Sequence, residues 1–208
     1  MAMGLYLVAA QVTRLGNASD AKVKLEALAT IARAMEAFTL ERGPLNVAMQ
    51  SELPTPDAVT TELATLSPRA DAGLKDIETR LSGLDNGQEL NEVYAQVKQN
   101  IITLRNQARA QMAKPKAERD AAFVKDYAAN AAKMIGGLTP LLDRLETETA
   151  TLSPNAGDYI STARLAMDLR SAAGNKGLAI TNVVGNSATA APVTLERLAD
   201  LSARIEEL

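Results

Sequence analysis

The sequence predicts an all-α protein, folded as an elongated up-and-down bundle of about six helices arranged as two stacked four-helix modules. Apolar residues make up 47% of the 208 residues, yet aromatic residues make up only 3% and alanine supplies much of the rest. An Ala-rich, aromatic-poor composition favours close packing of helix on helix. Apolar residues also recur three or four positions apart along most of the chain, and no stretch sustains the alternation expected of a strand.

The first predicted helix covers residues 5–49 and is unusually long. Its apolar positions keep the helical phase through Gly16 and Asn17, so we expect no break there. About 45 residues at about 1.5 Å each give a rod of roughly 65–70 Å, which predicts an elongated domain. Pro44 lacks an N–H group and its ring collides with the preceding turn, which predicts a kink near the end of this helix.

Five further helices are predicted from the same periodicity and from capping, Gly and Pro residues. They cover residues 56–84, 88–113, 117–152, 155–184 and 194–208. Thr55 is expected to cap the second helix, which is interrupted at Ser67 and Pro68. A Gly-Gly pair and Pro140 predict a kink within residues 117–152.

Arg42 occupies a position of the first helix that should face the core. The apolar positions around it, three or four residues apart, are Ala32, Met35, Phe38, Leu45 and Met49. A guanidinium group on that face needs hydrogen-bond acceptors, because burying it unpaired is costly. A core-facing cation beside backbone groups released at Gly43 and Pro44 is what a small-ligand site in a helical bundle needs. The alternative is an Arg42 that reaches past the core to an acidic residue of a neighbouring helix.

The remaining predicted site residues lie near three Gly- or Pro-containing points, at residues 43–44, 136–140 and 174–177. Arg170 lies on an apolar stripe of the fifth helix, and two core-facing guanidinium groups suit a carboxylate or a planar oxyanion. Carboxylates nearby are expected to bind a ligand amine or to neutralise the arginines of an empty site. The predicted ligand-binding set is Arg42, Arg33, Glu36, Asn46, Arg164, Asp168 and Arg170. Close Ala and Gly packing with helix curvature is the alternative explanation of the three points.

Similar segments in the two halves predict one ligand-sensing domain, residues 1–208, with an internal duplication of residues 20–84 and 155–208. The matched segments are residues 32–43 with 163–174, and residues 63–69 with 198–204. Ala- and Leu-rich helices also align by chance, as residues 61–70 do with residues 147–156. If the duplication is real, the second copy is unfinished and the natural chain continues beyond Leu208.

Composition argues against several classes of function. The chain has no Cys and no His, which removes Ser-His and Cys-His nucleophile pairs and His-based metal sites. We therefore expect no enzyme activity, no metal and no cofactor. A net charge of −3 without a basic stripe predicts no nucleic-acid partner. No stretch reaches the roughly 18–20 apolar residues of a membrane span. Residues 1–10 are apolar, as either the last turns of a transmembrane helix or an ordinary helix N-terminus.

Two segments resemble the extracytoplasmic sensor regions of bacterial transmembrane receptors: Met35-Glu-Ala-Phe-Thr-Leu-Glu-Arg-Gly-Pro-Leu-Asn46 and, more weakly, Ala166-Met-Asp-Leu-Arg-Ser-Ala-Ala-Gly174. These regions are the all-helical input domains of methyl-accepting chemotaxis proteins, sensor histidine kinases and diguanylate cyclases. The Glu-Arg-Gly piece is similar to that of the nitrate- and nitrite-sensing domain. The long-helix layout resembles the helical bimodular domain, which stacks two four-helix bundles.

The resemblance implies a periplasmic sensor domain of a signal-transduction receptor. Such a domain binds a small molecule inside the bundle, forms a homodimer and passes a piston or rotation movement along its terminal helices. Its membrane spans would flank this chain. Nitrate-contacting arginines of the family would correspond to Arg42 and Arg33. Because Asn175-Lys176-Gly177 replaces the second Glu-Arg-Gly, dicarboxylates, aromatic acids and amines stay open as ligands. The competing hypothesis is a helical scaffold or adaptor for a protein partner, with Arg42 in a direct ion pair.

Overall fold

The structure is all-helical over the residues that it describes. The computed structural model describes residues 2–185, 199–200 and 202–203, and these residues include no strand. The helices are α1 (Ala2–Gln50), α2 (Asp57–Ser82), α3 (Gly87–Met112), the short 3-10 helix η1 (Lys116–Glu118), α4 (Ala121–Gly136), α5 (Thr139–Leu152) and α6 (Pro154–Gly185). The prediction of an all-α helical bundle is confirmed.

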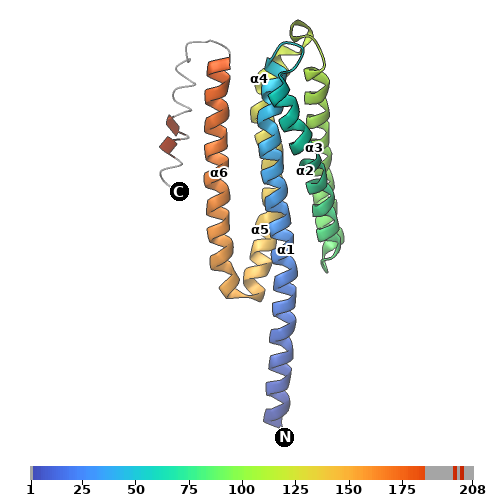
Figure 1. Ribbon diagram of the computed structural model, residues 1–208. Helices are drawn as coiled ribbons and strands as arrows, with labels where there is room; N and C mark the ends of the chain where they lie inside the picture. Colours follow the sequence, from blue (N-terminus) through green and yellow to red (C-terminus); the bar gives the residue numbers. More distant parts are fainter. Residues whose placement is uncertain (1, 186–198, 201, 204–208) are drawn as a thin grey trace.

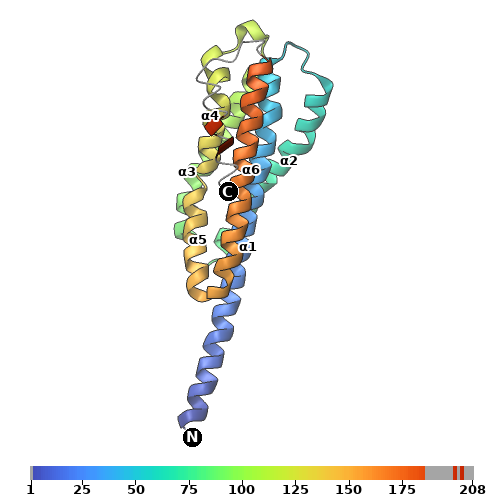
Figure 2. The same cartoon turned by 90° about the vertical axis from the view of Figure 1, so that its left-hand side faces the viewer.

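Helix α1 is the central element of the bundle. It contacts each of the other five α-helices, and its N-terminal part extends beyond their ends (Figure 1). Helices α2 and α3 form an antiparallel pair on one side of α1. Helices α4 and α5 follow each other down the bundle, and α6 returns beside α1 (Figure 2). Each helix thereby buries its apolar face against α1 or against a neighbour that contacts α1.

The buried apolar residues form two clusters that follow each other along the bundle. On α1 the larger cluster reaches Phe38, and the second cluster begins at Leu45. Between them α1 buries Glu41 and Arg42, and α3 buries Arg105. A layer of charged side chains therefore divides the core. Each of these buried charges destabilises the fold unless it is paired and hydrogen-bonded.

Two helices continue through proline residues. Helix α1 continues through Gly16, as expected, and also through Pro44. Helix α2 continues through Pro68, so the interruption predicted there is wrong. The Ser67 hydroxyl does not cap a new helix but donates a 2.7 Å hydrogen bond to Glu41. Packing against neighbouring helices outweighs the single backbone hydrogen bond that each proline removes.

The single kinked helix predicted for residues 117–152 is instead two helices. Helix α4 ends at Gly136, and α5 begins at Thr139 with Pro140 in its first turn. A proline fits this position because the first N–H groups of a helix have no intrahelical acceptor. The break places Gly136, which has no side chain, beside the space between α1 and α6 described below.

Asp120 and Arg119, which were not predicted from the sequence, form hydrogen bonds with free backbone groups at helix ends. Asp120 caps α4, with its carboxylate accepting a 3.0 Å hydrogen bond from the backbone N–H of Phe123. The Arg119 guanidinium donates hydrogen bonds to the backbone oxygens of Ala48, Met49, Ser51, Met112 and Lys114. Arg119 therefore fastens the C-terminal ends of α1 and α3 together. The prediction that Thr55 caps α2 is wrong. Pro56 is the residue directly before α2, and no side chain forms a capping hydrogen bond at this end of the helix.

The helix predicted from Thr194, which forms the last part of the second copy of the duplication, lies largely outside the described residues. Residues 199–200 and 202–203 are helical. The described helices lie side by side around α1, and two modules stacked end to end are not seen in this part of the chain. Over the described residues, no helix combines the length and the apolar character that crossing a bilayer requires.

Candidate functional site

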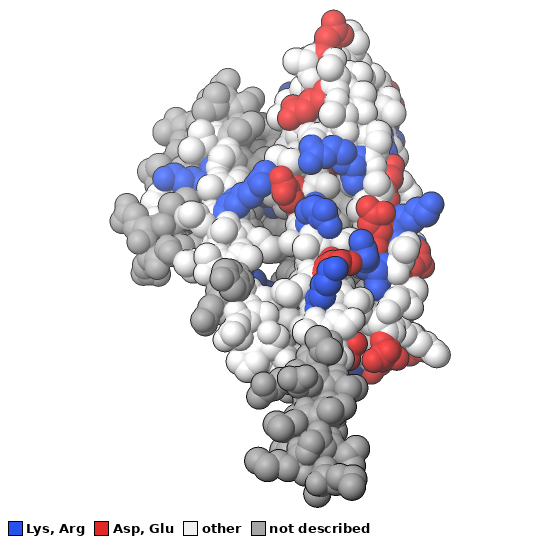
Figure 3. Space-filling model, turned by 60° about the horizontal axis from the view of Figure 1, so that its bottom comes forward, with Lys and Arg blue, Asp and Glu red and all other residues white. Residues whose placement is uncertain are grey.

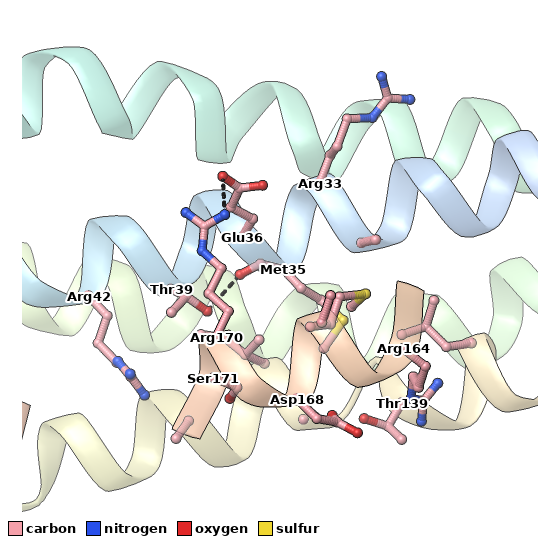
Figure 4. A pocket seen from close by; sticks show the side chains of 17 residues that line it. Arg33, Met35, Glu36, Thr39, Arg42, Thr139, Arg164, Asp168, Arg170 and Ser171 are labelled. Atoms are coloured by element: carbon pink, nitrogen blue, oxygen red, sulfur yellow. Dashed lines mark hydrogen bonds and ion pairs between the residues drawn. The ribbon is translucent and has the colours of Figure 1, made fainter. Parts of the chain in front are cut away.

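A cavity of about 450 Å³ lies between α1, the junction of α4 and α5, and α6. Figure 4 shows the side chains that line it. Six of the seven predicted site residues are among them: Arg33, Glu36 and Arg42 from α1, and Arg164, Asp168 and Arg170 from α6. The seventh, Asn46, is buried on α1 but does not line this cavity. The fold thus gathers side chains from two helices that are far apart in the sequence.

The cavity exists because α6 packs less tightly on α1 than the other helices do. Of the α6 side chains that the structure describes, only Ile160 and Ala172 are buried. Leu165 and Leu169 remain 47% and 39% exposed. On the opposite wall Gly136 contributes no side chain, so space remains between the three elements.

Arg42 lies at one end of the cavity and is 3% exposed, which confirms its predicted burial. No hydrogen bond or ion pair joins its guanidinium group to any other described residue, and its buried Nε atom has no partner. A Cβ atom placed on Gly174 of α6 would lie 3.9 Å from Nη2, so the group points between α1 and α6. Burial lowers the pKa of Arg42, and this effect outweighs the opposing influence of Tyr127. The acidic partner that the alternative explanation requires is not found among the described residues.

Glu41, the neighbour of Arg42 in the chain, is 1% exposed and fully engaged. Its carboxylate accepts hydrogen bonds of 2.6 and 2.9 Å from Arg105, one of 2.7 Å from Ser67 and one of 3.2 Å from Arg109. Arg105 also donates a 2.7 Å hydrogen bond to Asp71. Burial lowers the pKa of Arg105, but its hydrogen bonds to the two carboxylates outweigh burial and raise it. Since this cluster is self-contained, Glu41 does not neutralise Arg42.

A second, much smaller cavity of about 20 Å³ lies on the inner side of Arg42, next to Tyr127 and the Glu41 cluster. One water molecule needs roughly 10–15 Å³ of this kind of volume. There is therefore room for a single water beside Arg42 on this side, whereas the large cavity lies on the other. Burial raises the pKa of the Tyr127 hydroxyl, so this phenol stays neutral and can donate a hydrogen bond.

The other arginines of the large cavity differ from Arg42 in being compensated or exposed. Arg170 forms a 2.8 Å ion pair with Glu36 across the cavity mouth. Arg164 forms a 2.6 Å hydrogen bond with Asp143 and a looser 3.7 Å ion pair with Glu146. Arg33 is exposed, and its Nε atom donates a 3.1 Å hydrogen bond to a backbone oxygen of its own helix. Among the four arginines that line the cavity, Arg42 alone combines deep burial with the absence of a described partner.

The surface chemistry is mixed. Figure 3 shows Lys and Arg interspersed with Asp and Glu over the described residues of the face that it displays, and neither sign dominates there. Over the described part of the chain, no cluster of three or more acidic side chains is arranged to hold a metal ion. The polar groups that the cavity offers to a ligand are arginines, hydroxyls and the carboxylates of Glu36 and Asp168.

Two features of the site were not predicted from the sequence. Thr39, Thr139 and Ser171 add hydroxyl groups to the cavity wall, and Thr39 already donates a 2.8 Å hydrogen bond to Met35. The Glu41–Arg105 pair joins residues 64 positions apart. The sequence signal for both was present only as polar residues on otherwise apolar helical faces, which does not identify a partner.

Comparisons with family models, with curated proteins and with solved structures find no match to this chain.

Proposed function

We propose that this chain is a ligand-sensing helical domain that binds a small anion in the cavity between α1 and α6, with Arg42 as the principal contact. One observation carries this proposal: a buried guanidinium without a described partner borders a 450 Å³ cavity. An unpaired buried charge destabilises a fold and persists where a ligand supplies the missing partner. A bidentate carboxylate or oxyanion matches the planar, forked donor geometry of arginine.

The wider proposal follows the resemblance of residues 35–46 and 166–174 to extracytoplasmic sensor regions. In it the domain belongs to a bacterial signal-transduction receptor, lies on the periplasmic side and acts as a homodimer. When α4 and α5 are counted as one interrupted helix, the helix predicted for residues 194–208 is the sixth of the proposed up-and-down bundle. Ligand binding draws α6 toward α1, and the long α1 carries the displacement along its axis.

Thermal unfolding of the 208-residue chain with and without anions tests the binding step. A ligand at 100 times its Kd stabilises the folded state by about 2.7 kcal/mol. We expect stabilisation of the unmodified chain by an anion, its loss in Arg42→Met and its retention in Arg80→Met. Arg80 is a suitable control because it is exposed and its guanidinium pairs with Glu26 at the surface. Stabilisation that survives Arg42→Met, or no stabilisation by any small anion at millimolar concentration, refutes the proposal.

The movement of α6 can be tested separately with spin labels. Because the chain has no cysteine of its own, labels attach only at cysteines introduced for the purpose. Spin labels on Lys22→Cys of α1 and Leu169→Cys of α6 report the separation of the two helices. Both native side chains are exposed, so labelling should not disturb the core. A stabilising anion is expected to shorten and narrow the distance distribution. An unchanged distribution on binding would remove the proposed signal while leaving the binding site in place.

A helical scaffold or adaptor is the second candidate function. It is favoured by the exposed apolar side chains of α6, Leu165, Leu169 and Ile180, which follow helical spacing on its outer face. An adaptor gains no stability from small anions. If the chain is an adaptor, changing both Leu165 and Leu169 to Ser should abolish partner binding. If it is a sensor, the same double change should leave its stabilisation by anions intact.

A further inference from the structure

We infer that the ligand of this cavity is a monocarboxylate with an apolar body, rather than an inorganic oxyanion or a dicarboxylate. This inference rests on the proposed function and specifies its ligand. It follows from the charges, the volume and the walls of the cavity.

The charges allow for one anionic group. Arg170 is paired with Glu36, and Arg164 is paired with Asp143 and Glu146. Only Arg42 is both buried and without a described partner. A second carboxylate on the ligand would therefore compete with existing ion pairs, and it would face the side chains of Glu36 and Asp168, which also line the cavity. Like charges at short range are unfavourable, so a dicarboxylate is disfavoured.

The volume is too large for an inorganic oxyanion. A single water molecule needs roughly 10–15 Å³ of this kind of volume. The cavity of about 450 Å³ would hold such an ion and remain mostly filled with water. Its size instead falls within the range of about 300–1,000 Å³ typical of organic-ligand pockets. Along α1 the lining residues run from Ala32 to Arg42, which corresponds to about 15 Å of helix.

The walls combine a polar end around Arg42 with a mixed lining beyond it, where apolar side chains lie among Arg164, Asp168 and Thr139. A Cβ atom on Gly174 would lie 3.9 Å from Arg42 Nη2 and 3.7 Å from Thr39 Cγ2, so these two side chains meet at that point of α6. Figure 4 shows Ser171 on the same side of the cavity. A carboxylate at this end can accept hydrogen bonds from the guanidinium and from a hydroxyl.

Four larger apolar side chains contribute to the cavity wall, beside the ion-paired Arg164 and Arg170: Met35, Ile135, Leu142 and Met167. Methionine is flexible and polarisable and adapts to ligands of different shape. A ligand that leaves these four side chains in contact with water would forgo the gain from covering apolar surface, about 25 cal/mol per Å². The occupant that satisfies the polar end and covers these side chains is an acid with a single carboxylate and an alkyl or aryl body.

Calorimetric titration of the intact chain with matched acids tests the inference. Each buried methylene contributes about 0.8 kcal/mol, or about a fourfold gain in affinity. Lengthening acetate to hexanoate adds four methylenes and is therefore expected to tighten binding by about 200-fold, and phenylacetate is expected to bind more tightly than acetate. Arg42→Met abolishes this binding, Arg80→Met leaves it unchanged, and Met167→Ser lowers the affinity for hexanoate but not for acetate.

The outcomes separate the ligand class from the proposed function. Nitrate or succinate binding more tightly than hexanoate, in a manner that depends on Arg42, overturns the ligand class and leaves the anion site standing. Equal binding of hexanol and hexanoate overturns the role of the charge. If no anion binds, the proposed function itself fails.

Discussion

Glu41 and Arg42 are consecutive residues of α1 and both are almost completely buried, yet only Glu41 has hydrogen-bond partners for its charged group among the described residues. The Glu41 carboxylate accepts hydrogen bonds from three side chains of α2 and α3. The Arg42 guanidinium faces α4 and α6 and has no described partner. The difference follows from packing, since α2 and α3 lie close on one side of α1 whereas α6 leaves a cavity on the other. A buried charge can therefore be structural or available for a ligand, depending on which helix meets it.

The two sides of α1 therefore have different roles. The side that faces α2 and α3 holds the bundle together. On the side that faces α6, the unpaired Arg42 guanidinium destabilises the fold, and a bound anion can relieve this cost. Sites that bind ligands are often less stable than their surroundings for this reason. Single substitutions on both sides of α1 test whether they differ in this way.

The largest effect is expected from Glu41→Ala. It leaves Arg105 buried without its main partner, although Arg105 keeps Asp71. Breaking a buried ion pair by removing one member costs about 3–5 kcal/mol. Urea unfolding followed by circular dichroism should show this loss, whereas Ser67→Ala, which removes one hydrogen bond to the same carboxylate, should cost only about 1 kcal/mol. A loss below about 1 kcal/mol for Glu41→Ala would mean that the cluster contributes little.

Arg42→Met is expected to have the opposite sign. Replacing an unpaired buried guanidinium with an apolar side chain of similar length removes a desolvation cost, so the ligand-free protein should gain about 1–2 kcal/mol in the free energy of unfolding. The gain should be absent in a saturating concentration of the ligand, because only the unmodified chain is stabilised by it. Destabilisation of the ligand-free protein by this change would contradict the view that Arg42 is uncompensated.

Gly73 of α2 and Gly174 of α6 allow the closeness of packing on the two sides of α1 to be compared. A Cβ on Gly73 of α2 would lie 2.9 Å from the Cβ of Ala34, which is a collision, whereas a Cβ on Gly174 of α6 has its nearest neighbour at 3.7 Å. Gly73→Ala should therefore destabilise the fold by about 1–2 kcal/mol net. Gly174→Ala should stabilise it by about 0.5–1 kcal/mol through helix propensity.

Thermal and urea unfolding of both glycine variants give the comparison directly. Equal effects would show that α6 packs as closely on α1 as α2 does. Because the added methyl group of Gly174→Ala lies near Arg42, this variant should also bind the ligand less tightly than the unmodified chain.

The smallest effect concerns Glu148, which connects both sides at the foot of the bundle. It contacts Lys24 of α1, Asn86 between α2 and α3, and Arg144 of α5. Burial alone would raise the pKa of Glu148, but hydrogen bonds from Lys24 and Arg144 outweigh it and lower the pKa. A carboxylate whose pKa is lowered by folding stabilises the protein above its unfolded-state pKa and loses this contribution as the pH falls through its folded-state pKa.

Comparing Glu148→Gln with the unmodified chain at several pH values measures that contribution. The stability difference should be largest near neutral pH, stay below about 1 kcal/mol because the site is partly solvated, and shrink toward zero in acid. A difference that grows as the pH falls would reverse the assigned direction of the pKa shift.

Much of the secondary structure was predictable because helices follow from local patterns. The bounds of α1, α3 and α6 agree with the predicted segments 5–49, 88–113 and 155–184 within a few residues. The errors concern prolines and glycines. Pro68 did not interrupt α2, whereas the glycines at residues 136–137 separated two helices. Local rules state what a residue disfavours, but tertiary packing decides whether that preference prevails.

The sequence by itself determined that Arg42 would be buried, because residue 42 falls on the apolar stripe of a long helix and helical spacing is a local property. It also placed Arg33, Glu36, Arg164, Asp168 and Arg170 near Gly- and Pro-containing points, and all five line one cavity. Only the tertiary structure decided that Glu41 would be paired and Arg42 left without a described partner. That outcome depends on Arg105, which lies 64 residues away from Glu41, and on the distance between α6 and α1, and neither is encoded in the periodicity of a single helix.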